Sequence, residues 1–250
     1  MNWVVMHRFF IDPSDIQDGR VQFPEETSLQ MKKVLRLRSG NEVVVFDGGG
    51  VDYQVRLEVV EAKASFGTVL STNDSNNEPA IFITLYQALI RSERYEYALQ
   101  KGVEAGISRF VPFTSERTQV STPSHSKMGR WRRIIKEAAE QSGRSVVPKL
   151  ADPILFSNMI KNLNSVALIP WEQEKNQSIK QVLSRSHQDP GLNVTSIDLI
   201  IGPIGGFTPQ EVSDAVDCGA TSVSLGKRIL RSETAGIVAA VAVLYEFDDI

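Results

Sequence analysis

The stretch SIDLIIGPIGGFTPQEVSDAVDCG, residues 196–219, contains the clearest structural signals of the sequence. It opens with a continuous apolar run, which is typical of a strand buried on both faces of a sheet. Three glycines and one proline follow within five positions, and such a turn is either a plain turn or a place where a ligand approaches the backbone. The remainder predicts a helix with Thr208 as its N-cap, Pro209 in its first turn and Gly219 after its end. The stretch is therefore the strand, turn and helix of an α/β sheet.

The same alternation continues on both sides of this stretch and predicts an α/β domain with a mainly parallel sheet. The predicted order is an apolar run at 80–89, a helix at 92–106, a strand at 110–115, a helix at 124–143, a strand at 165–171, a helix at 178–186, the strand and helix of 196–219, a strand at 221–226 and a last helix from Ser232. That helix contains TAGIVAAVAVLY, which is apolar nearly all round and is expected to be buried, at a dimer interface in one interpretation.

The first 71 residues predict a separate, barrel-like β module. Two β-branched runs flank Asp47 and the three glycines that follow it, which is a hairpin signal, and residues 64–72 supply another short strand. A short helix is expected within 24–37, with Thr27 or Ser28 near its N-cap.

Residues 72–79, TNDSNNEP, contain no apolar side chain and are the best linker in the chain. The predicted domains are therefore 1–71 and 80–250, joined by this linker.

The net charge of −3 conceals an uneven distribution of charge. Residues 91–149 contain 12 Lys and Arg against 6 Asp and Glu, whereas residues 150–250 contain 7 against 12. A basic middle in an acidic chain indicates a surface for a polyanion, and a solvated helix face is the alternative. No apolar run reaches the ~18 residues of a membrane span, and the start has no signal-peptide pattern. We therefore expect a soluble, cytoplasmic protein without a membrane partner.

Several familiar sites are missing from the sequence. There is no G-x-x-x-x-G-K-[ST] phosphate loop and no G-x-S-x-G elbow, and GPIGG does not fit the dinucleotide pattern G-x-G-x-x-G. The three histidines, His7, His125 and His187, are scattered, and Cys218 is the single cysteine, so neither a metal site nor a disulfide framework is expected.

Three predicted strand ends form the candidate ligand site, namely residues 167–172, 200–207 and 223–236. Ligands of open α/β sheets bind beyond the carboxyl ends of the strands. The glycines of these loops either let a ligand approach the backbone or only permit positive φ in turns; they are Gly202, Gly205, Gly206 and Gly226. The third loop also joins cations to a helix start, which favours anions or electron-rich groups.

The predicted helix at 124–143 has one apolar and one basic face. Its apolar face contains Met128, Trp131, Ile134, Ile135, Ala138, Ala139 and Ser142, and its basic residues are Lys127, Arg130, Arg132, Arg133 and Lys136. Phosphate binding and a solvated face both explain the basic residues. We expect Trp131 to belong to the core rather than to stack on a base.

Four stretches together resemble the ribosomal RNA small subunit methyltransferase E family, of the SPOUT class of knotted methyltransferases. They are RSERYEYALQKGVEAGISRFVPFTSER, RWRRIIKEAAEQSGR, IIGPIGGFTPQEV and SLGKRILRSETA, and HRFF and VLRLRSGNEVVVFDG extend the resemblance to the N-terminus. The resemblance implies an N-terminal PUA-like β-barrel that helps to hold RNA and a C-terminal α/β domain with a deep trefoil knot. It also implies a homodimer that methylates N3 of one uridine in the 16S rRNA of the small ribosomal subunit, with S-adenosylmethionine as cofactor and S-adenosylhomocysteine as product.

The resemblance also implies roles for individual residues. The cofactor contacts would come from Leu168, Ile169, Pro170, Ile201, Gly202, Pro203, Ile204, Gly205, Gly206, Ser224, Leu225, Gly226, Ile229, Leu230 and Thr234. Arg231 and Arg228 are the candidates that stabilise a uridine anion, and Glu233 is the candidate proton acceptor, although a carboxylate in the first turn of a helix is favoured in any case. Candidate RNA contacts are Arg8, Arg36, Arg38, Arg91, Arg94, Arg117, Arg130 and Arg133.

Two positions depart from the family pattern. The family usually has GPEGG where this chain has Ile204, and many members have His where this chain has Gln30. The missing carboxylate at position 204 puts a catalytic or rigidifying role for that acid in doubt. Two alternatives therefore stay open: a knotted methyltransferase with another target, such as a ribose 2′-hydroxyl, and a non-catalytic RNA-binding protein of ribosome assembly.

Overall fold

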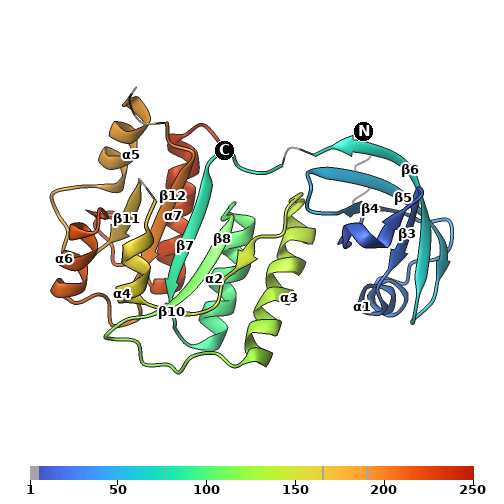
Figure 1. Ribbon diagram of the computed structural model, residues 1–250, viewed down its shortest axis with the longest axis horizontal. Helices are drawn as coiled ribbons and strands as arrows, with labels where there is room; N and C mark the ends of the chain where they lie inside the picture. Colours follow the sequence, from blue (N-terminus) through green and yellow to red (C-terminus); the bar gives the residue numbers. More distant parts are fainter. Residues whose placement is uncertain (1–5, 76, 165, 190, 192) are drawn as a thin grey trace. The chain divides into compact units, whose positions relative to one another are not determined.

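The computed structural model describes residues 6–75, 77–164, 166–189, 191 and 193–250 (Figure 1). The chain divides into two compact units, which are treated separately below. Unit 1 consists of Met1–Glu78 with Ala139–Val147, and unit 2 consists of Pro79–Ala138 with Pro148–Ile250. No helix in the described part of the chain is long and apolar enough to cross a membrane. The first five residues, on which part of the signal-peptide prediction depends, lie outside the described residues.

Unit 1 is built around a mixed six-stranded sheet in the order β1-β4-β5-β6-β3-β2. Its elements are β1 (Arg8–Phe10), η1 (Pro13–Asp15), β2 (Ile16–Gln17), β3 (Arg20–Phe23), α1 (Glu25–Leu29), η2 (Gln30–Val34), β4 (Glu42–Phe46), β5 (Val51–Val60) and β6 (Ser65–Asp74). Strand β1 is parallel to β4, and the other pairs are antiparallel. The predicted hairpin is confirmed, because β4 pairs with β5 around a turn in which Gly48 and Gly50 have positive φ.

The start of helix α1 shows which residue occupies its N-cap. Pro24 is the N-cap residue, without a side-chain cap, and the helix begins at Glu25. Thr27 and Ser28 are buried inside the helix, and the Ser28 hydroxyl donates to the Phe23 carbonyl at 3.0 Å. Thr27 and Ser28 therefore lie near the N-cap, as predicted, but neither caps the helix, since the Ser28 hydroxyl donates to the carbonyl at the end of the preceding strand.

Strand β6 is longer than predicted. Its ladder with β5 continues to the pair Val51 and Asp74, three residues into the segment 72–79 that was expected to be a linker. Polar side chains are compatible with this strand because its last residues are exposed. Residue 76 of the same segment lies outside the described residues.

Unit 2 is a sheet of seven strands in which every described pair is parallel, as the sequence predicts. The order is β10-β8-β7-β12-β11-β13, with β9 beside β8. The elements are β7 (Phe82–Ala88), α2 (Ser92–Glu104), β8 (Arg109–Thr114), α3 (His125–Ser142, its last residues grouped with unit 1), β9 (Lys149–Leu150), β10 (Ile154–Leu155), α4 (Phe156–Met159), η3 (Ile160–Asn162), β11 (Ala167–Pro170), α5 (Ile179–Gln188), β12 (Ser196–Ile201), α6 (Pro209–Asp217), β13 (Thr221–Val223) and α7 (Ser232–Glu246). Residue 165, the first of a predicted strand, lies outside the described residues.

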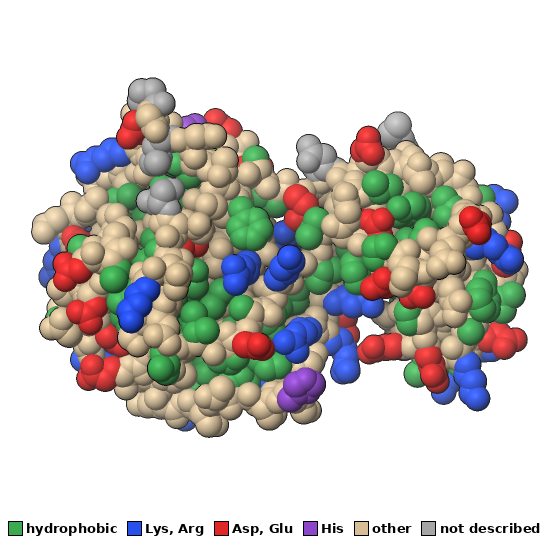
Figure 2. Space-filling model, viewed as in Figure 1, with side chains coloured by type: hydrophobic (Ala, Val, Ile, Leu, Met, Phe, Trp, Pro, Cys, Tyr) green, Lys and Arg blue, Asp and Glu red, His purple; other side chains and the backbone are tan. Residues whose placement is uncertain are grey.

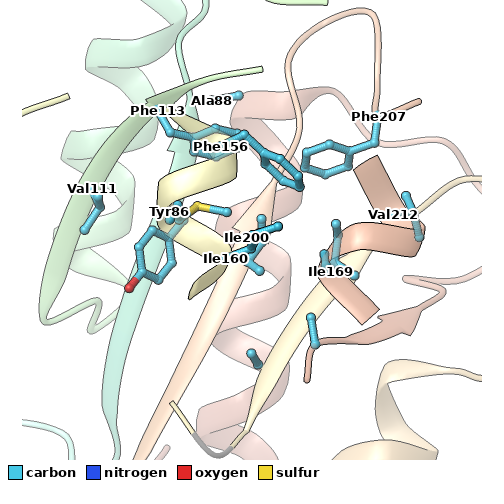
Figure 3. Close-up of a cluster of buried hydrophobic side chains, with 14 residues drawn as sticks. Tyr86, Ala88, Val111, Phe113, Phe156, Ile160, Ile169, Ile200, Phe207 and Val212 are labelled. Atoms are coloured by element: carbon cyan, nitrogen blue, oxygen red, sulfur yellow. The ribbon is translucent and has the colours of Figure 1, made fainter. Parts of the chain in front are cut away.

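Helices cover both faces of this sheet, which explains its continuous apolar strands. Tyr86 and Ala88 of β7 join a buried cluster with side chains of α4 and α6, among them Phe156 and Val212 (Figure 3). The alternate residue Leu85 meets Gly236 of α7 on the opposite face. Helix α7 packs against β7, β12, α2 and α5.

Two helix predictions are confirmed in the main, each with a correction. On α3 the apolar face is buried as expected, including Trp131 at 0% exposure, but Ile134 is half-buried and Ser142 is exposed. Helix α7, expected to be buried, is only partly so within one chain: Val238, Val241 and Tyr245 are 40%, 40% and 71% exposed. Their spacing of three and four residues places them on one outer face of the helix.

Candidate functional site

The carboxyl ends of three neighbouring parallel strands bring the three candidate loops to one edge of the sheet. Strand β12 lies beside β11, and β11 lies beside β13. The loops that follow β11 and β13 are joined by backbone hydrogen bonds: Trp171 N donates to Val223 O at 3.0 Å, and Ser224 N donates to Gln177 O at 2.8 Å. The loops that the sequence predicts to share a site are therefore neighbours.

The first glycine of the turn after β12 is required by the protein's own packing. A Cβ on Gly202 would lie 3.0 Å from the ring of Phe207, which is 1% exposed. That ring is stacked on Phe113 at 6.3 Å and tilted against Phe156 at 5.7 Å, so it anchors the turn in the core (Figure 3). The space beside Gly202 is therefore taken up by a phenylalanine ring of the protein itself.

The same test, asking what a Cβ would meet, separates the other three glycines of the candidate loops. A Cβ on Gly205 would meet the Arg117 side chain at 3.3 Å, and one on Gly206 would meet a Glu172 carboxylate oxygen at 3.0 Å. Gly206 also has φ of +69°. Only Gly226, with φ of +110°, has no atom within 4 Å of a built Cβ. Gly206 and Gly226 therefore have the positive φ of a plain turn, Gly226 also has open space for a ligand beside its backbone, and Gly202 and Gly205 lie against side chains of the protein itself.

The predicted cofactor contacts differ in what they can offer a ligand. The side chains of Leu168, Ile169 and Ile201 are at most 2% exposed, so only their backbone could reach a ligand. Ile229 is 86% exposed and Ile204 is 55% exposed. Pro203 is buried, Gly226 is exposed, and Pro170, Ser224, Leu225, Leu230 and Thr234 are partly exposed.

Unpartnered polar atoms gather around the same edge. Seven buried side-chain N or O atoms in the described residues have no hydrogen-bond partner. Four of them belong to β7, β13 and the loops and helix start of this edge: Gln87 Oε1, Trp171 Nε1, Ser222 Oγ and Glu233 Oε2. Buried polar groups are normally paired, so these four atoms mark the edge as a place where the protein leaves hydrogen-bonding capacity unused.

The start of α7 carries the three candidate catalytic side chains. Arg231 is the N-cap residue of α7, and Arg231 and Arg228 are exposed. Glu233 lies in the first turn and is 9% exposed. One of its carboxylate oxygens is 3.6 Å from Nε of Arg94, so two of the predicted residues are brought together from α7 and α2.

In unit 1, the candidate RNA contacts differ in whether they have an ion-pair partner within the protein. Arg8 forms a two-point ion pair with Asp52 at 2.6 and 2.9 Å, and its side chain is 16% exposed. Arg36 and Arg38 are exposed, and no ion pair of either occurs among the described residues. Arg36 has φ of +54° in a basic segment that also contains Lys32 and Lys33. Free, exposed cations are suited to phosphate, whereas Arg8 already has a structural partner.

In unit 2, the predicted RNA contacts have varied surroundings. Arg117 donates to the carbonyls of Gly205 at 3.0 Å and Phe207 at 3.3 Å, so it supports the glycine turn. Arg130 pairs with Glu96 at 2.8 Å while staying 65% exposed. Arg91 and Arg133 are exposed, and Figure 2 shows Lys and Arg side chains gathered over the part of unit 2 that holds α3.

A pocket of about 360 Å³ that the sequence did not predict opens between the starts of α2 and α3. It is lined by Ser92, Glu93, Glu96, Ser124, Ser126, Lys127 and Arg130. Its acidic and basic side chains are mixed, and Arg130 and Glu96 bind each other. Among the described residues, no group of three or more His, Cys, Asp or Glu side chains could hold a metal ion.

Comparison with known proteins agrees with this architecture. Residues 76–244 match the model of an RNA methyltransferase domain, and residues 31–70 match that of an RNA methyltransferase PUA domain. A ribosomal RNA small subunit methyltransferase E from Synechocystis is 32% identical and covers 95% of this chain and 77% of the relative. The corresponding protein from Mesomycoplasma hyopneumoniae is 32% identical over 93% of this chain and 96% of its own length.

Solved structures extend the likeness to three dimensions. A ribosomal RNA small subunit methyltransferase E from Neisseria gonorrhoeae, bound to S-adenosylmethionine, has a TM-score of 0.85 and 31% identity, covering 96% of this chain and 97% of its own. A methyltransferase from Legionella pneumophila, also with bound S-adenosylmethionine, has a TM-score of 0.87 and 30% identity, covering 97% and 98%.

The fold and the site thus define an RNA methyltransferase with an N-terminal PUA domain. The parallel sheet with its loop cluster and the mixed sheet of unit 1 are the two parts of that class. The chain belongs to the ribosomal RNA small subunit methyltransferase E family.

Proposed function

We propose that this protein uses S-adenosylmethionine to methylate N3 of a uridine in the 16S rRNA of the small ribosomal subunit. The observation that carries the proposal is the cluster of three loops at the carboxyl edge of a parallel sheet, in a chain whose similar structures hold S-adenosylmethionine. The named relatives support rRNA as the substrate. The choice of uridine N3 comes from the motifs that resemble the family.

The loops offer groups that suit this cofactor. The main chain of 168–170, 201–206 and 224–226 supplies donors and acceptors, and Ile229, Leu230 and Thr234 lie on the third loop or the helix after it. Gly226 leaves open space beside the backbone, and Trp171 and Ser222 hold buried polar atoms without partners at the same edge. When bound, the cofactor would supply an electrophilic methyl group on a positively charged sulfur.

The protein's own task in the reaction is to make uridine N3 a nucleophile. N3 of a neutral uridine carries a proton, so the enzyme has to hold the base in line with the methyl group and favour loss of that proton. Orientation of this kind can contribute roughly 7–11 kcal/mol in favourable cases. The base has to leave its stack to be reached, which costs a few kcal/mol.

The start of α7 supplies the side chains for this step. In the proposal, the guanidinium of Arg231, supported by Arg228, stabilises negative charge on the uracil ring. Both side chains are exposed, so an incoming base can reach them. Glu233 is proposed to accept the N3 proton; its Oε2 has no hydrogen-bond partner but is buried, so the base reaches it only when side chains around the start of α7 move.

RNA binding is proposed to use both domains, with 1–71 as an RNA-holding module, 72–79 as a linker and 80–250 as the methyltransferase domain, whose knot remains a prediction. Arg36 and Arg38 are the proposed contacts with the best exposure in unit 1. The other proposed contacts are Arg8, Arg91, Arg94, Arg117, Arg130 and Arg133. Neutralising phosphates with such cations makes RNA affinity depend on salt.

A homodimer in the cytoplasm is part of the same proposal. The outer face of α7, with Val238, Val241 and Tyr245, supports it because an exposed apolar stripe is typical of a surface that another chain covers.

Two measurements test the proposed function. Calorimetry should show that the protein binds S-adenosylmethionine, and absence of binding at submillimolar cofactor would contradict any methyltransferase activity. Mass spectrometry of 16S rRNA from a deletion strain should show loss of one N3-methyluridine. If that mark persists while the protein binds cofactor, another RNA position, such as a ribose 2′-hydroxyl, is the target.

A further inference from the structure

We propose that Gln87 and Ser232 form a tether that positions the start of α7 against the glycine turn after β12. The inference rests on the proposed function, because it assigns these residues to the same methyl-transfer site. Gln87 is the next-to-last residue of β7 and is 1% exposed. Its Nε2 donates to Ser232 Oγ at 2.9 Å, and that hydroxyl donates to the carbonyl oxygen of Gly202 at 2.6 Å.

The tether joins three elements that the reaction needs in register. Gly202 opens the turn that is proposed to contact the cofactor, and Ser232 is the first residue of α7. The residues on either side of Ser232 are Arg231 and Glu233, the proposed anion stabiliser and proton acceptor. Two hydrogen bonds in series therefore set the spacing between the cofactor turn and the catalytic side chains. Misplacement by about 1 Å can cost about 100-fold in rate, so this spacing matters.

Within the described part of the chain, the start of α7 is also contacted by Arg94 of α2, through its 3.6 Å ion pair with Glu233, but that contact does not reach the glycine turn. The N-cap residue of α7, Arg231, makes no side-chain cap hydrogen bond. The N-cap threonine of α6 and the N-cap serine of α5, in contrast, both form capping boxes with their own helices. The hydroxyl at the start of α7 is instead used outward, toward the glycine turn and β7.

The chemistry of Gln87 argues against a role in packing alone. Its Oε1 is buried without a hydrogen-bond partner and lies 3.5 Å from the position that a Cβ on Gly236 would take. A buried acceptor without a partner lowers stability, and an unbranched apolar side chain of similar length would avoid that cost. The amide contributes the donor that orients the Ser232 hydroxyl toward Gly202.

The test compares Gln87→Met and Ser232→Ala with the wild-type protein. Calorimetry measures the Kd for S-adenosylmethionine, single-turnover transfer to 16S rRNA measures the rate, and thermal unfolding measures stability. We expect each variant to weaken cofactor affinity by about tenfold and to slow transfer, which is the effect of losing one or two hydrogen bonds. Gln87→Met should do so without lowering the Tm, because it also removes the unpartnered oxygen. Ser232→Thr, which keeps the hydroxyl, should retain most of the affinity.

Ser184→Ala is the matched control. Ser184 Oγ donates to Glu246 Oε1 at 2.6 Å at the opposite end of α7, so this variant loses a hydroxyl hydrogen bond of the same length. It should leave the Kd for S-adenosylmethionine unchanged. Wild-type Kd and rate in Gln87→Met and Ser232→Ala would overturn the tether, as would a Gln87→Met protein whose Tm falls in step with its affinity or a Ser232→Thr protein that behaves like Ser232→Ala. Failure of the wild-type protein itself to bind S-adenosylmethionine would instead overturn the proposed function.

Discussion

Replacing Gly202 with alanine tests the conclusion that this glycine serves the protein's own packing. The new Cβ would lie 3.0 and 3.1 Å from Cε2 and Cδ2 of Phe207, closer than ordinary contact. The ring has little freedom to move away, since Phe113 and Phe156 pack against it and it is 1% exposed. Overpacking a core by one methyl group costs about 1–3 kcal/mol, and the lower entropy of the unfolded chain returns about 0.4–1 kcal/mol.

The net loss should therefore be about 1–2 kcal/mol in the free energy of unfolding. For a chain of this size, that corresponds to a Tm lower by roughly 2–8 °C. Urea unfolding and thermal melting measure the two quantities. Alanine at position 202 should be tolerated only when the ring of Phe207 is absent, so Phe207→Leu is the informative second substitution.

A double-mutant cycle tests whether the ring of Phe207 causes the cost of Gly202→Ala. In the Phe207→Leu background the cost of Gly202→Ala should fall below about 0.5 kcal/mol, because the colliding ring atoms are gone. Gly226→Ala is the control: no atom lies within 4 Å of its Cβ, so its cost comes from φ of +110° and should be equal in both backgrounds. Equal costs of Gly202→Ala in the two backgrounds would refute the steric explanation.

Four further outcomes are expected. Arg231→Ala should abolish methyl transfer and leave the Kd for S-adenosylmethionine within about twofold; wild-type turnover would refute its role. Burial raises the pKa of Asp198 above its ordinary 3.8, so the native state binds that proton more tightly than the unfolded state does. The free energy of unfolding should therefore fall as pH rises through the folded pKa. Urea unfolding at pH 4–7 should show a smaller fall in Asp198→Asn than in the wild-type protein, and parallel curves of the two proteins would contradict the prediction. Arg36→Ala should reduce the salt slope of RNA binding by about 0.7–0.9, whereas Arg20→Ala, which removes a residue already in an ion pair, should not. Ile204→Glu should keep wild-type Tm and cofactor affinity, and loss of binding would show that this turn is built differently.

The long elements could be predicted because their local patterns are strong. The helix after the glycine turn has the predicted cap, proline and terminal glycine, with a complete capping box between Thr208 and Glu211. Strands β9 and β10 have two residues each and α4 has four, which is too short for a periodic signal, and all three were missed. The order of the strands in the sheet could not be predicted from the sequence either, because it depends on pairings between distant segments.

The candidate site could be placed but not resolved into roles. The loops at the strand ends could be located in the sequence because glycines follow the apolar strands, so the position of the site at this edge was predictable. The tether was not, because Gln87 stands inside an apolar run and its partner is 145 residues away. The glycines were ambiguous for a different reason. A glycine in the sequence shows that the Cβ is absent, but it does not show whether a ligand or a phenylalanine ring occupies the space beside it.

The position of Glu172 bears on the apolar residue in the glycine turn. A family pattern with an acid at position 204 places a carboxylate on this turn, whereas Ile204 does not. In the structure, however, a Glu172 carboxylate oxygen lies 3.0 Å from the position of a Cβ on Gly206, so the loop after β11 brings a negative charge to the same turn. Ile204 is 55% exposed, and a second carboxylate there would be screened by solvent and salt. The turn therefore keeps a carboxylate without an acid at position 204, which is why exchanging Ile204 for glutamate should change so little.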